Sequence, residues 1–229
     1  MQTNLKATAY ILNRRPFRDN SFLVDVLTAE YGKFRCVARV AKQRGKILKG
    51  TLEPFVFAQA HWLEKNELHQ LRAWDELERH PLNPSNLLHG LYMNELLLRL
   101  LWDQQAIDDL FQRYQRSLTH LAHEPFAVMQ FELDLLHYLG HNLHYPNGIA
   151  AIDPQQPYYY RLDAGFVDRH SPNSATVVIS GKLLSALHQE TALDKPDLSA
   201  LRRLLDQFFR YLLQGKPLHT RKLLPMMGS

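Results

Sequence analysis

The chain has 229 residues, of which 45% are hydrophobic and 22% charged, and its formal net charge is +4. This composition is typical of a folded globular protein and excludes a disordered chain. The single cysteine, Cys36, excludes an intramolecular disulfide and a metal site built from cysteines alone. The sequence has no apolar run long enough to span a membrane and no signal-peptide pattern, so we expect a cytoplasmic protein.

Positive charge is concentrated at the start of the chain. Residues 1–50 carry eleven Lys/Arg but only three Asp/Glu, a net charge of +8, and the rest of the chain is net negative. Such a basic segment produces a field that attracts a polyanion such as nucleic acid. A run of bases is also the ordinary composition of a solvated surface, and the charge count by itself leaves that alternative open.

Residues 5–78 have the pattern of short β-strands. Strand-forming runs occur at 21–28, 33–40, 55–62 and 68–74, after an earlier strand that starts near residue 5, and Gly32 supplies a tight turn. Strict alternation over 33–40 predicts a strand with one apolar and one basic face. Its inward residues would be Phe34, Cys36 and Ala38, and its outward bases Lys33, Arg35 and Arg39. Five strands in fewer than 80 residues favour a small closed β-barrel.

The pattern becomes helical after Pro81 and Pro84. Helices are predicted over 85–104, 106–123, 125–139, 181–190 and 197–214. Residues 141–180 are irregular, with β-like pieces at 158–162 and 176–180. In the last helix, a stripe from Leu201 to Leu212 faces the core, and four charged residues are expected opposite it, namely Arg202, Arg203, Asp206 and Arg210.

The predicted fold is therefore α+β. A small N-terminal β-barrel occupies residues 1–80 and would carry the nucleic-acid-binding surface. A mainly α-helical domain follows over 81–229, with 141–180 as an embedded subdomain.

The bases on the predicted barrel are the candidate contacts to the phosphates of a nucleic acid. They recur on a strand face, in the adjoining loop and in a turn, which favours a binding surface over a solvated one. Phe17, Phe22 and Tyr31 are candidates to stack on unpaired bases, although aromatic residues in strands more often belong to the core. The candidate DNA-binding residues are Arg14, Arg15, Arg18, Lys33, Arg35, Arg39, Lys42, Arg44, Lys46 and Lys49.

Enzymatic chemistry has weaker support. The sequence contains no phosphate-binding loop, no dinucleotide-binding glycine motif and no nucleophile elbow. His137, His141 and His144 have a spacing that could hold a metal, but there is no HExxH motif, and Cys36 belongs to the other predicted domain. We expect no catalytic residue, no metal and no cofactor. A histidine-based metal hydrolase around 137–144 is kept as an alternative.

Several segments resemble the bacterial RecO family of recombination mediators. They are RRPFRDNSFLVDVLTAEYGK at 14–33, LKGTLEPF at 48–55, GLYMNELLLR at 90–99, FEL at 131–133 and GKPLHTR at 215–221. The resemblance runs in the same order from residue 9 to about residue 224.

The resemblance implies an N-terminal barrel of the oligonucleotide-binding (OB) type and a cytoplasmic, nucleoid-associated protein. It implies binding of single- and double-stranded DNA, annealing of complementary strands and contact with the partner RecR. It also implies docking on the acidic C-terminal tail of single-stranded DNA-binding protein (SSB), which helps RecA to load on SSB-coated DNA. A different class of function stays open, in which the chain is a non-enzymatic adaptor that docks acidic protein tails without annealing DNA.

The chain departs from the family in two places. Many members carry four zinc-binding cysteines in the embedded subdomain, but residues 141–172 contain none, so a zinc-less version is expected. Some relatives have arginine where this chain has Met129 and Gln130. An acidic tail ending in a carboxylate needs a guanidinium beside an apolar pocket. The candidates to supply that cation are Arg113, Arg116 and Arg221.

Overall fold

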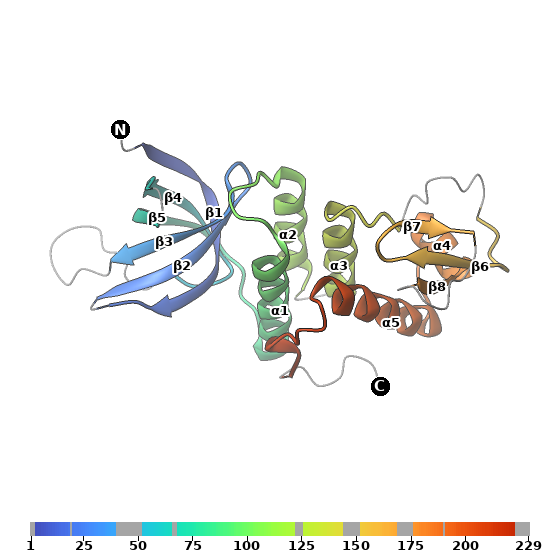
Figure 1. Ribbon diagram of the computed structural model, residues 1–229. Helices are drawn as coiled ribbons and strands as arrows, with labels where there is room; N and C mark the ends of the chain where they lie inside the picture. Colours follow the sequence, from blue (N-terminus) through green and yellow to red (C-terminus); the bar gives the residue numbers. More distant parts are fainter. Residues whose placement is uncertain are drawn as a thin grey trace. The chain divides into compact units, whose positions relative to one another are not determined.

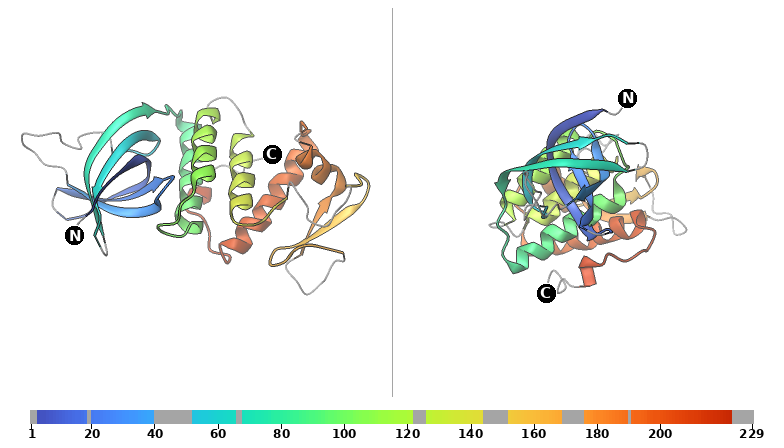
Figure 2. Two further views of the ribbon diagram at one scale, coloured as in Figure 1. Left: turned by 90° about the horizontal axis from the view of Figure 1, so that it is seen from above. Right: turned by 90° about the vertical axis from the view of Figure 1, so that its left-hand side faces the viewer.

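The first five strands form a closed sheet through five strand pairings, four of them antiparallel and one parallel. The computed structural model describes residues 3–18, 20–39, 52–65, 68–121, 126–143, 152–168, 176–189 and 191–222. The first strands are β1 (Asn4–Pro16), β2 (Ser21–Thr28), β3 (Gly32–Arg39), β4 (Val56–Leu63) and β5 (His69–Arg79). They form a closed barrel in the order β1-β2-β3-β5-β4, with β4 pairing back onto β1 (Figures 1 and 2). Among the five described strands of the barrel, β3 and β5 are the parallel pair.

The alternation predicted for residues 33–40 is confirmed in β3. Phe34, Cys36 and Ala38 are buried in the barrel core, and Arg35 and Arg39 are exposed on the outside. Successive side chains of a strand point to opposite faces, so this pattern follows directly from the period of two. The same core is filled from the other strands by small and aromatic side chains, such as Ala58, Ala60 and Trp62.

The β2–β3 turn contacts the segment that follows the first helix. Gly32 has a φ of +61°, and a Cβ at this position would overlap the backbone of Gln105. Two backbone hydrogen bonds hold the contact: Gln104 N donates to Lys33 O at 2.8 Å, and Ile107 N donates to Ala29 O at 2.8 Å. This turn is therefore packed against residues 104–107 and is not a free loop tip.

Helices α1 (Pro84–Leu100) and α2 (Asp108–His120) belong to the same compact unit as the barrel. The Asn83 side chain caps α1 by accepting from Asn86 N at 2.9 Å, and Pro84 occupies the first turn. The predicted extent of this helix, 85–104, is too long at its end. Leu101 is already extended and Gln104 has a φ of +58°. The chain leaves the helix there, and Gln104 N donates to Lys33 O of the barrel instead of continuing the helical ladder.

The described chain divides into two compact units. The first contains residues up to Val128 and the segment from Leu218 onward, and the second contains 129–217. Glu95 on α1 fixes the returning C-terminal segment, because its carboxylate accepts from His219 N (2.8 Å), Thr220 N (2.9 Å) and Thr220 Oγ1 (2.7 Å). The short helix η1 (Thr220–Lys222) lies in this segment.

The second unit combines helices with a small sheet. Helix α3 (Ala127–Tyr138) leads into it, and the sheet has the order β7-β6-β8, followed by α4 (Gly181–His188) and α5 (Lys195–Leu212). The strands are β6 (Pro157–Arg161), β7 (Gly165–Val167) and β8 (Thr176–Ser180). The three-residue strand β7 was too short to be seen in the sequence. Among the described residues, no helix is long and apolar enough to cross a membrane.

The prediction that Arg202 faces solvent on α5 is wrong. Its side chain is buried and donates to both carboxylate oxygens of Glu132, at 2.6 and 2.7 Å. Asp206, one helical turn further on, accepts from Arg202 Nε at 2.9 Å. A buried guanidinium is tolerated where carboxylates satisfy its donors, which a helical periodicity alone does not reveal.

Candidate nucleic-acid interface

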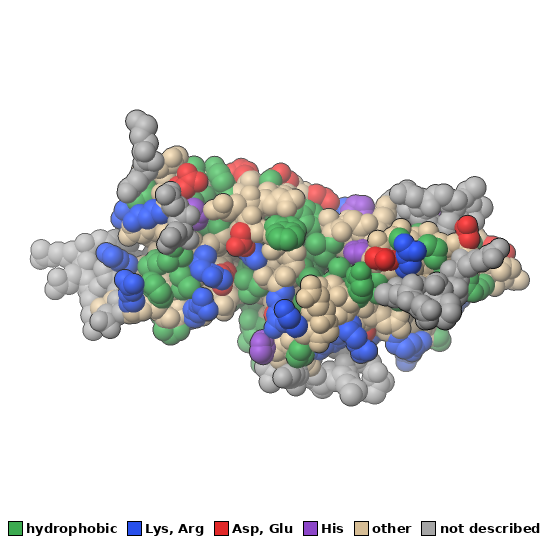
Figure 3. All heavy atoms as spheres, viewed as in Figure 1, with side chains coloured by type: hydrophobic (Ala, Val, Ile, Leu, Met, Phe, Trp, Pro, Cys, Tyr) green, Lys and Arg blue, Asp and Glu red, His purple; other side chains and the backbone are tan. Residues whose placement is uncertain are grey.

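The outer face of β1, β2 and β3 carries the predicted bases that lie closest together. Cross-strand partners share a face of the sheet, and the register aligns Asn13 with Asp25 and Arg35. The next row on the same face aligns Arg15 with Leu23 and Val37. We use the name basic face for the outward Arg15, Lys33, Arg35 and Arg39. Figure 3 shows Lys and Arg side chains gathered over the barrel strands, with a few acidic side chains among them.

A polar pocket of about 380 Å³ opens in the basic face. Arg35 Nε donates to Asp25 Oδ1 at 2.7 Å, and Asn13 Nδ2 reaches Asp25 Oδ2 at 3.3 Å. This pairing orients Arg35 while about half of its side chain, 51%, stays exposed. Arg15 is exposed and has no ion-pair partner among the described residues. The lining is Asn13, Arg15, Asp25, Lys33, Phe34, Arg35, His69, Leu98, Asp103 and Gln104.

Lys33 differs from the other bases of this face because its amine is used inside the protein. Only 12% of its side chain is exposed. Nζ donates to the carbonyl of Leu98 at 2.8 Å and pairs with the Asp103 carboxylate at 3.0 Å. The amine therefore holds the end of α1 and the following segment against the barrel.

Arg14 lies apart from the basic face. Alternation turns Arg14 to the other side of β1 from Arg15, where it lines a second pocket, of about 430 Å³, together with Arg79 and Phe55. Its guanidinium carbon lies 5.1 Å from the centre of the Phe22 ring. Arg18 lies in the β1–β2 turn with a φ of +50°. The predicted bases thus occupy more than one surface of the barrel. Lys42, Arg44, Lys46 and Lys49 lie outside the described residues.

The three aromatic residues predicted as candidates for base stacking all have contacts within the protein. Phe22 and Tyr31 are half-buried against the barrel core, and Tyr31 meets the Trp62 ring edge-on at 5.2 Å. Phe17 is half-buried beneath the Arg18 guanidinium, at 5.3 Å. These contacts agree with the core interpretation of the strand aromatics.

The histidine cluster has no metal-site geometry in the part of the chain that the structure describes. No group of three or more His, Cys, Asp or Glu is close enough there to hold a metal ion. His141 packs beside Phe208 and its Nδ1 lies 3.2 Å from the Tyr160 hydroxyl, and burial lowers the pKa of its ring. His144 lies outside the described residues. Burial also raises the pKa of the Cys36 thiol, which makes it a poor nucleophile.

The cations predicted for an acidic tail all fall in the first unit. Arg113 Nε donates to Asp109 at 2.8 Å within α2, Arg116 is exposed on the same helix, and Arg221 is half-buried in η1. Gln130 on α3 makes a long contact of 3.4 Å from its Nε2 to Asp134 Oδ1.

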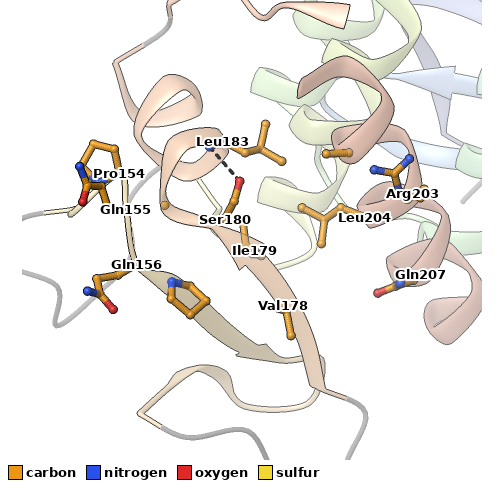
Figure 4. Close-up of a pocket in the computed structure, with 13 residues that line it drawn as sticks. Pro154, Gln155, Gln156, Val178, Ile179, Ser180, Leu183, Arg203, Leu204 and Gln207 are labelled. Carbon is orange, nitrogen blue, oxygen red and sulfur yellow. Dashed lines mark hydrogen bonds between the residues drawn. The ribbon is translucent and has the colours of Figure 1, made fainter. Parts of the chain in front are cut away.

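The second unit contains a pocket of about 490 Å³ that the sequence did not indicate. It lies along β8 and α5, and Figure 4 shows Arg203, Leu204 and Gln207 on the side of α5 that faces the strand. Strand β8 is at the edge of its sheet. Among the described lining residues Arg203 alone is charged, and the rest are Pro154, Gln155, Gln156, Pro157, Val178, Ile179, Ser180, Gly181, Leu183, Ala200, Leu204 and Gln207.

Comparison with known protein families assigns nearly the whole chain. Residues 1–78 match the sequence model for the N-terminal region of recombination protein O, and residues 81–222 match the one for its C-terminal region. The chain belongs to the RecO family. The resemblance seen in the sequence is thereby confirmed. The match to the C-terminal region begins at residue 81, whereas α1 and α2 are packed in one compact unit with the barrel.

Curated relatives agree along nearly their full length. DNA repair protein RecO of Psychromonas ingrahamii is 32% identical over 222 residues, which cover 94% of this chain and 95% of the relative. The proteins of the same name from Vibrio vulnificus and Serratia proteamaculans are each 33% identical and cover 95% and 94% of this chain, and 92% and 91% of the relatives. This RecO-family chain is therefore a protein of DNA repair and recombination.

Proposed function

We propose that this RecO-family protein binds single- and double-stranded DNA on the basic face and anneals complementary strands without consuming a nucleotide. The observation that carries the proposal is the alignment of Arg15, Arg35 and Arg39 on the outside of one sheet. Arg15 and Arg39 have no ion-pair partner among the described residues, so their charge is available to a ligand. We assign the barrel to the OB type, because its closed order β1-β2-β3-β5-β4 suits a fold that binds oligonucleotides across its strands.

The mechanism would be electrostatic. Guanidinium groups neutralise phosphates and release condensed counterions, which favours binding at low salt and does not depend on base sequence. Two strands held on one cationic surface repel each other less, and their bases can then pair. The protein contributes charge and position, so no catalytic residue, cofactor or metal enters the scheme.

The partners would be those of a recombination mediator. We propose that the chain acts with RecR and docks on the acidic tail of SSB, so that RecA can load on the DNA. This proposal is supported by membership of the RecO family and by the basic face. The identities of the partners are those that the resemblance to the family implies.

The β8–α5 pocket is our candidate for the tail. An edge strand presents every second N–H and C=O outward, so an extended peptide can add to it. Ile179, Leu183 and Leu204 supply apolar lining, and Arg203 supplies a guanidinium for a carboxylate. Replacing Arg203 with Glu should then weaken binding of a synthetic tail peptide about tenfold or more. If replacement of Arg113, Arg116 or Arg221 has that effect instead, the tail docks on the first unit.

The adaptor alternative makes a different prediction. If the basic face docks only an acidic protein surface, the chain should bind acidic peptides strongly and duplex DNA weakly at the same salt concentration. An oligonucleotide would then displace the acidic peptide from Arg15 and Arg39 poorly.

The experiment that tests the proposal is annealing of two complementary oligonucleotides, naked or coated with SSB that has or lacks its acidic tail. Acceleration on coated DNA that requires the tail supports both the DNA surface and the docking site. Acceleration on naked DNA alone supports the basic face and rejects tail docking by this chain. Absence of acceleration in all three reactions favours the adaptor.

A further inference from the structure

Trp102 is the most exposed large hydrophobic side chain among the described residues. It follows α1 directly, and 79% of its surface is accessible to solvent. The other two tryptophans, Trp62 and Trp74, are 2% and 5% exposed. A single exposed hydrophobic side chain is common on protein surfaces, so the exposure of Trp102 gains meaning only from the segment and the pocket beside it.

The segment that carries Trp102 is held firmly against the barrel. Asp103 forms a bridge with Lys33 of β3, and the Lys33 amine bonds both to Asp103 and to the last turn of α1. Gln104 donates its backbone N–H to Lys33 O, and its side-chain Nε2 lies 3.1 Å from His69 Nε2. These bonds place the tryptophan on a pre-organised segment, which reduces the entropy lost when a ligand is bound.

The same segment forms a wall of the pocket in the basic face. Asp103 and Gln104 line that pocket together with Arg15 and Arg35 of the barrel strands. The exposed indole is therefore adjacent in the chain to a pocket that contains guanidinium groups. Proteins that bind single strands combine cations for the backbone with an aromatic platform for the bases.

We propose that Trp102 stacks on an unpaired base of a single strand whose phosphates contact Arg15 and Arg35. This inference rests on the proposed binding of DNA by the basic face. Stacking is tolerant of sequence because every base has an aromatic face, and it favours single strands because the bases of a duplex are already stacked. Trp102 would thus distinguish single-stranded from double-stranded DNA on a surface whose charge attracts both.

Tryptophan emission provides the test in this 229-residue chain. Because Trp62 and Trp74 are buried, quenching by an oligonucleotide reports mainly on Trp102, and the Trp102→Phe variant should lose that signal. A poly-dT strand should quench the emission. A fully abasic strand of the same length, which has the phosphates without the bases, should bind without quenching.

Affinity measurements by fluorescence anisotropy complete the test. Trp102→Ala should lose about 5- to 100-fold in affinity for the dT strand, as expected for one lost stack, and should bind duplex DNA as the wild type does. Tyr211→Ala is the matched control, since Tyr211 is also exposed, at 41%, but lies on α5 of the second unit. It should leave both affinities unchanged.

The two levels of the proposal fail in different ways. If the dT strand binds without quenching and Trp102→Ala binds it as tightly as the wild type, the stacking inference is overturned while DNA binding stands. If the wild type binds no DNA at moderate salt, the DNA function itself fails, and the stacking role falls with it.

Discussion

Arg202 and Glu132 form a two-pronged ion pair in the second unit, although 70 residues separate them in the sequence. Glu132 is fully buried and Arg202 nearly so. In a bidentate pair, both oxygens of the carboxylate and two nitrogens of the guanidinium are satisfied at once. The pair joins α3 to α5 and fixes the position of the helix that lines the β8–α5 pocket.

Breaking this pair should destabilise the protein strongly. Arg202→Met leaves the Glu132 carboxylate buried without its partner, and we expect a loss of about 3–5 kcal/mol in the free energy of unfolding. The exposed neighbour Arg203 gives a matched control, and Arg203→Met should change stability by no more than about 0.5 kcal/mol. Urea denaturation followed by circular dichroism measures both. Equal stability of the two variants would show that the ion pair is unimportant.

Gly32 should be intolerant of a side chain. Its φ of +61° is unfavourable for other residues, and an added Cβ would overlap Gln105. Gly32→Ala should therefore cost about 2–4 kcal/mol, from backbone strain together with displacement of residues 104–107. Gly215 has a similar φ of +73° but open space around it, so Gly215→Ala should show only the strain, about 1 kcal/mol. Thermal melts of the two variants compare these costs. Equal melting temperatures would show that the close approach of Gly32 to Gln105 adds nothing to the backbone strain.

Lys33 and Arg15 should separate structural from DNA-binding roles on one face. Lys33→Met removes the amine bonds to Leu98 and Asp103, so we expect a lower melting temperature. Arg15→Met removes an exposed, unpartnered cation, so it should leave the melting temperature unchanged and reduce DNA affinity at moderate salt. The opposite pattern, with a stable Lys33→Met that has lost DNA binding, would make Lys33 a direct phosphate contact.

His69 should make stability depend on pH. Burial lowers the pKa of its ring below the ordinary value of 6.5, although the charge of Glu64 acts in the opposite direction. Lys65 N–H donates to Nδ1 at 3.1 Å, so protonation of that nitrogen would also remove a hydrogen bond. The ring is packed on Phe34, and its Nε2 faces Gln104.

Because the pKa of His69 is lower in the folded chain than in the unfolded one, the protein should lose stability as the solution becomes more acidic. As the pH falls below 6.5, the unfolded chain binds a proton at this site before the folded one does, and stability decreases down to the folded-state pKa. His69→Gln should therefore lose less stability than the wild type when the pH is lowered from 7.5 to 5.5. His137→Gln, which removes a histidine at an exposed position on α3, is the matched control for the substitution itself. The midpoints of urea denaturation at the two pH values measure this loss for each protein. An equal loss in the wild type and in His69→Gln would contradict the prediction.

The sequence predicted those parts of the fold that depend on local periodicity. The strand at 21–28 was placed at its true bounds, and the inward set of β3 was correct, because alternation alone determines which side chains face the core. The end of α1 was misplaced because it is set by bonds between Lys33 and residues 98–104, which are distant in sequence.

The site was less predictable than the fold. The sequence predicts that Arg202 faces solvent, because charged side chains are usually exposed. Its buried partner Glu132 lies on another helix, so the periodicity of α5 cannot reveal the pair. Lys33, Arg35 and Arg39 alternate identically in the sequence, but only the tertiary contacts of Lys33 show that its amine is occupied. Trp102 falls inside the helix that the sequence predicts over 85–104, so the pattern does not mark it as a residue beyond the helix end. Its exposure could not be read from that pattern.

The salt dependence of binding tests the central claim, that the basic face holds DNA by phosphate neutralisation. Affinity for a single-stranded oligonucleotide would be measured from low to moderate salt for the wild type and for Arg15→Ala/Arg39→Ala. We predict weaker binding to every sequence, with the slope of log K against log salt reduced by about 0.7 for each lost contact. Unchanged affinity and slope in the double variant would contradict the account and place the DNA on another surface.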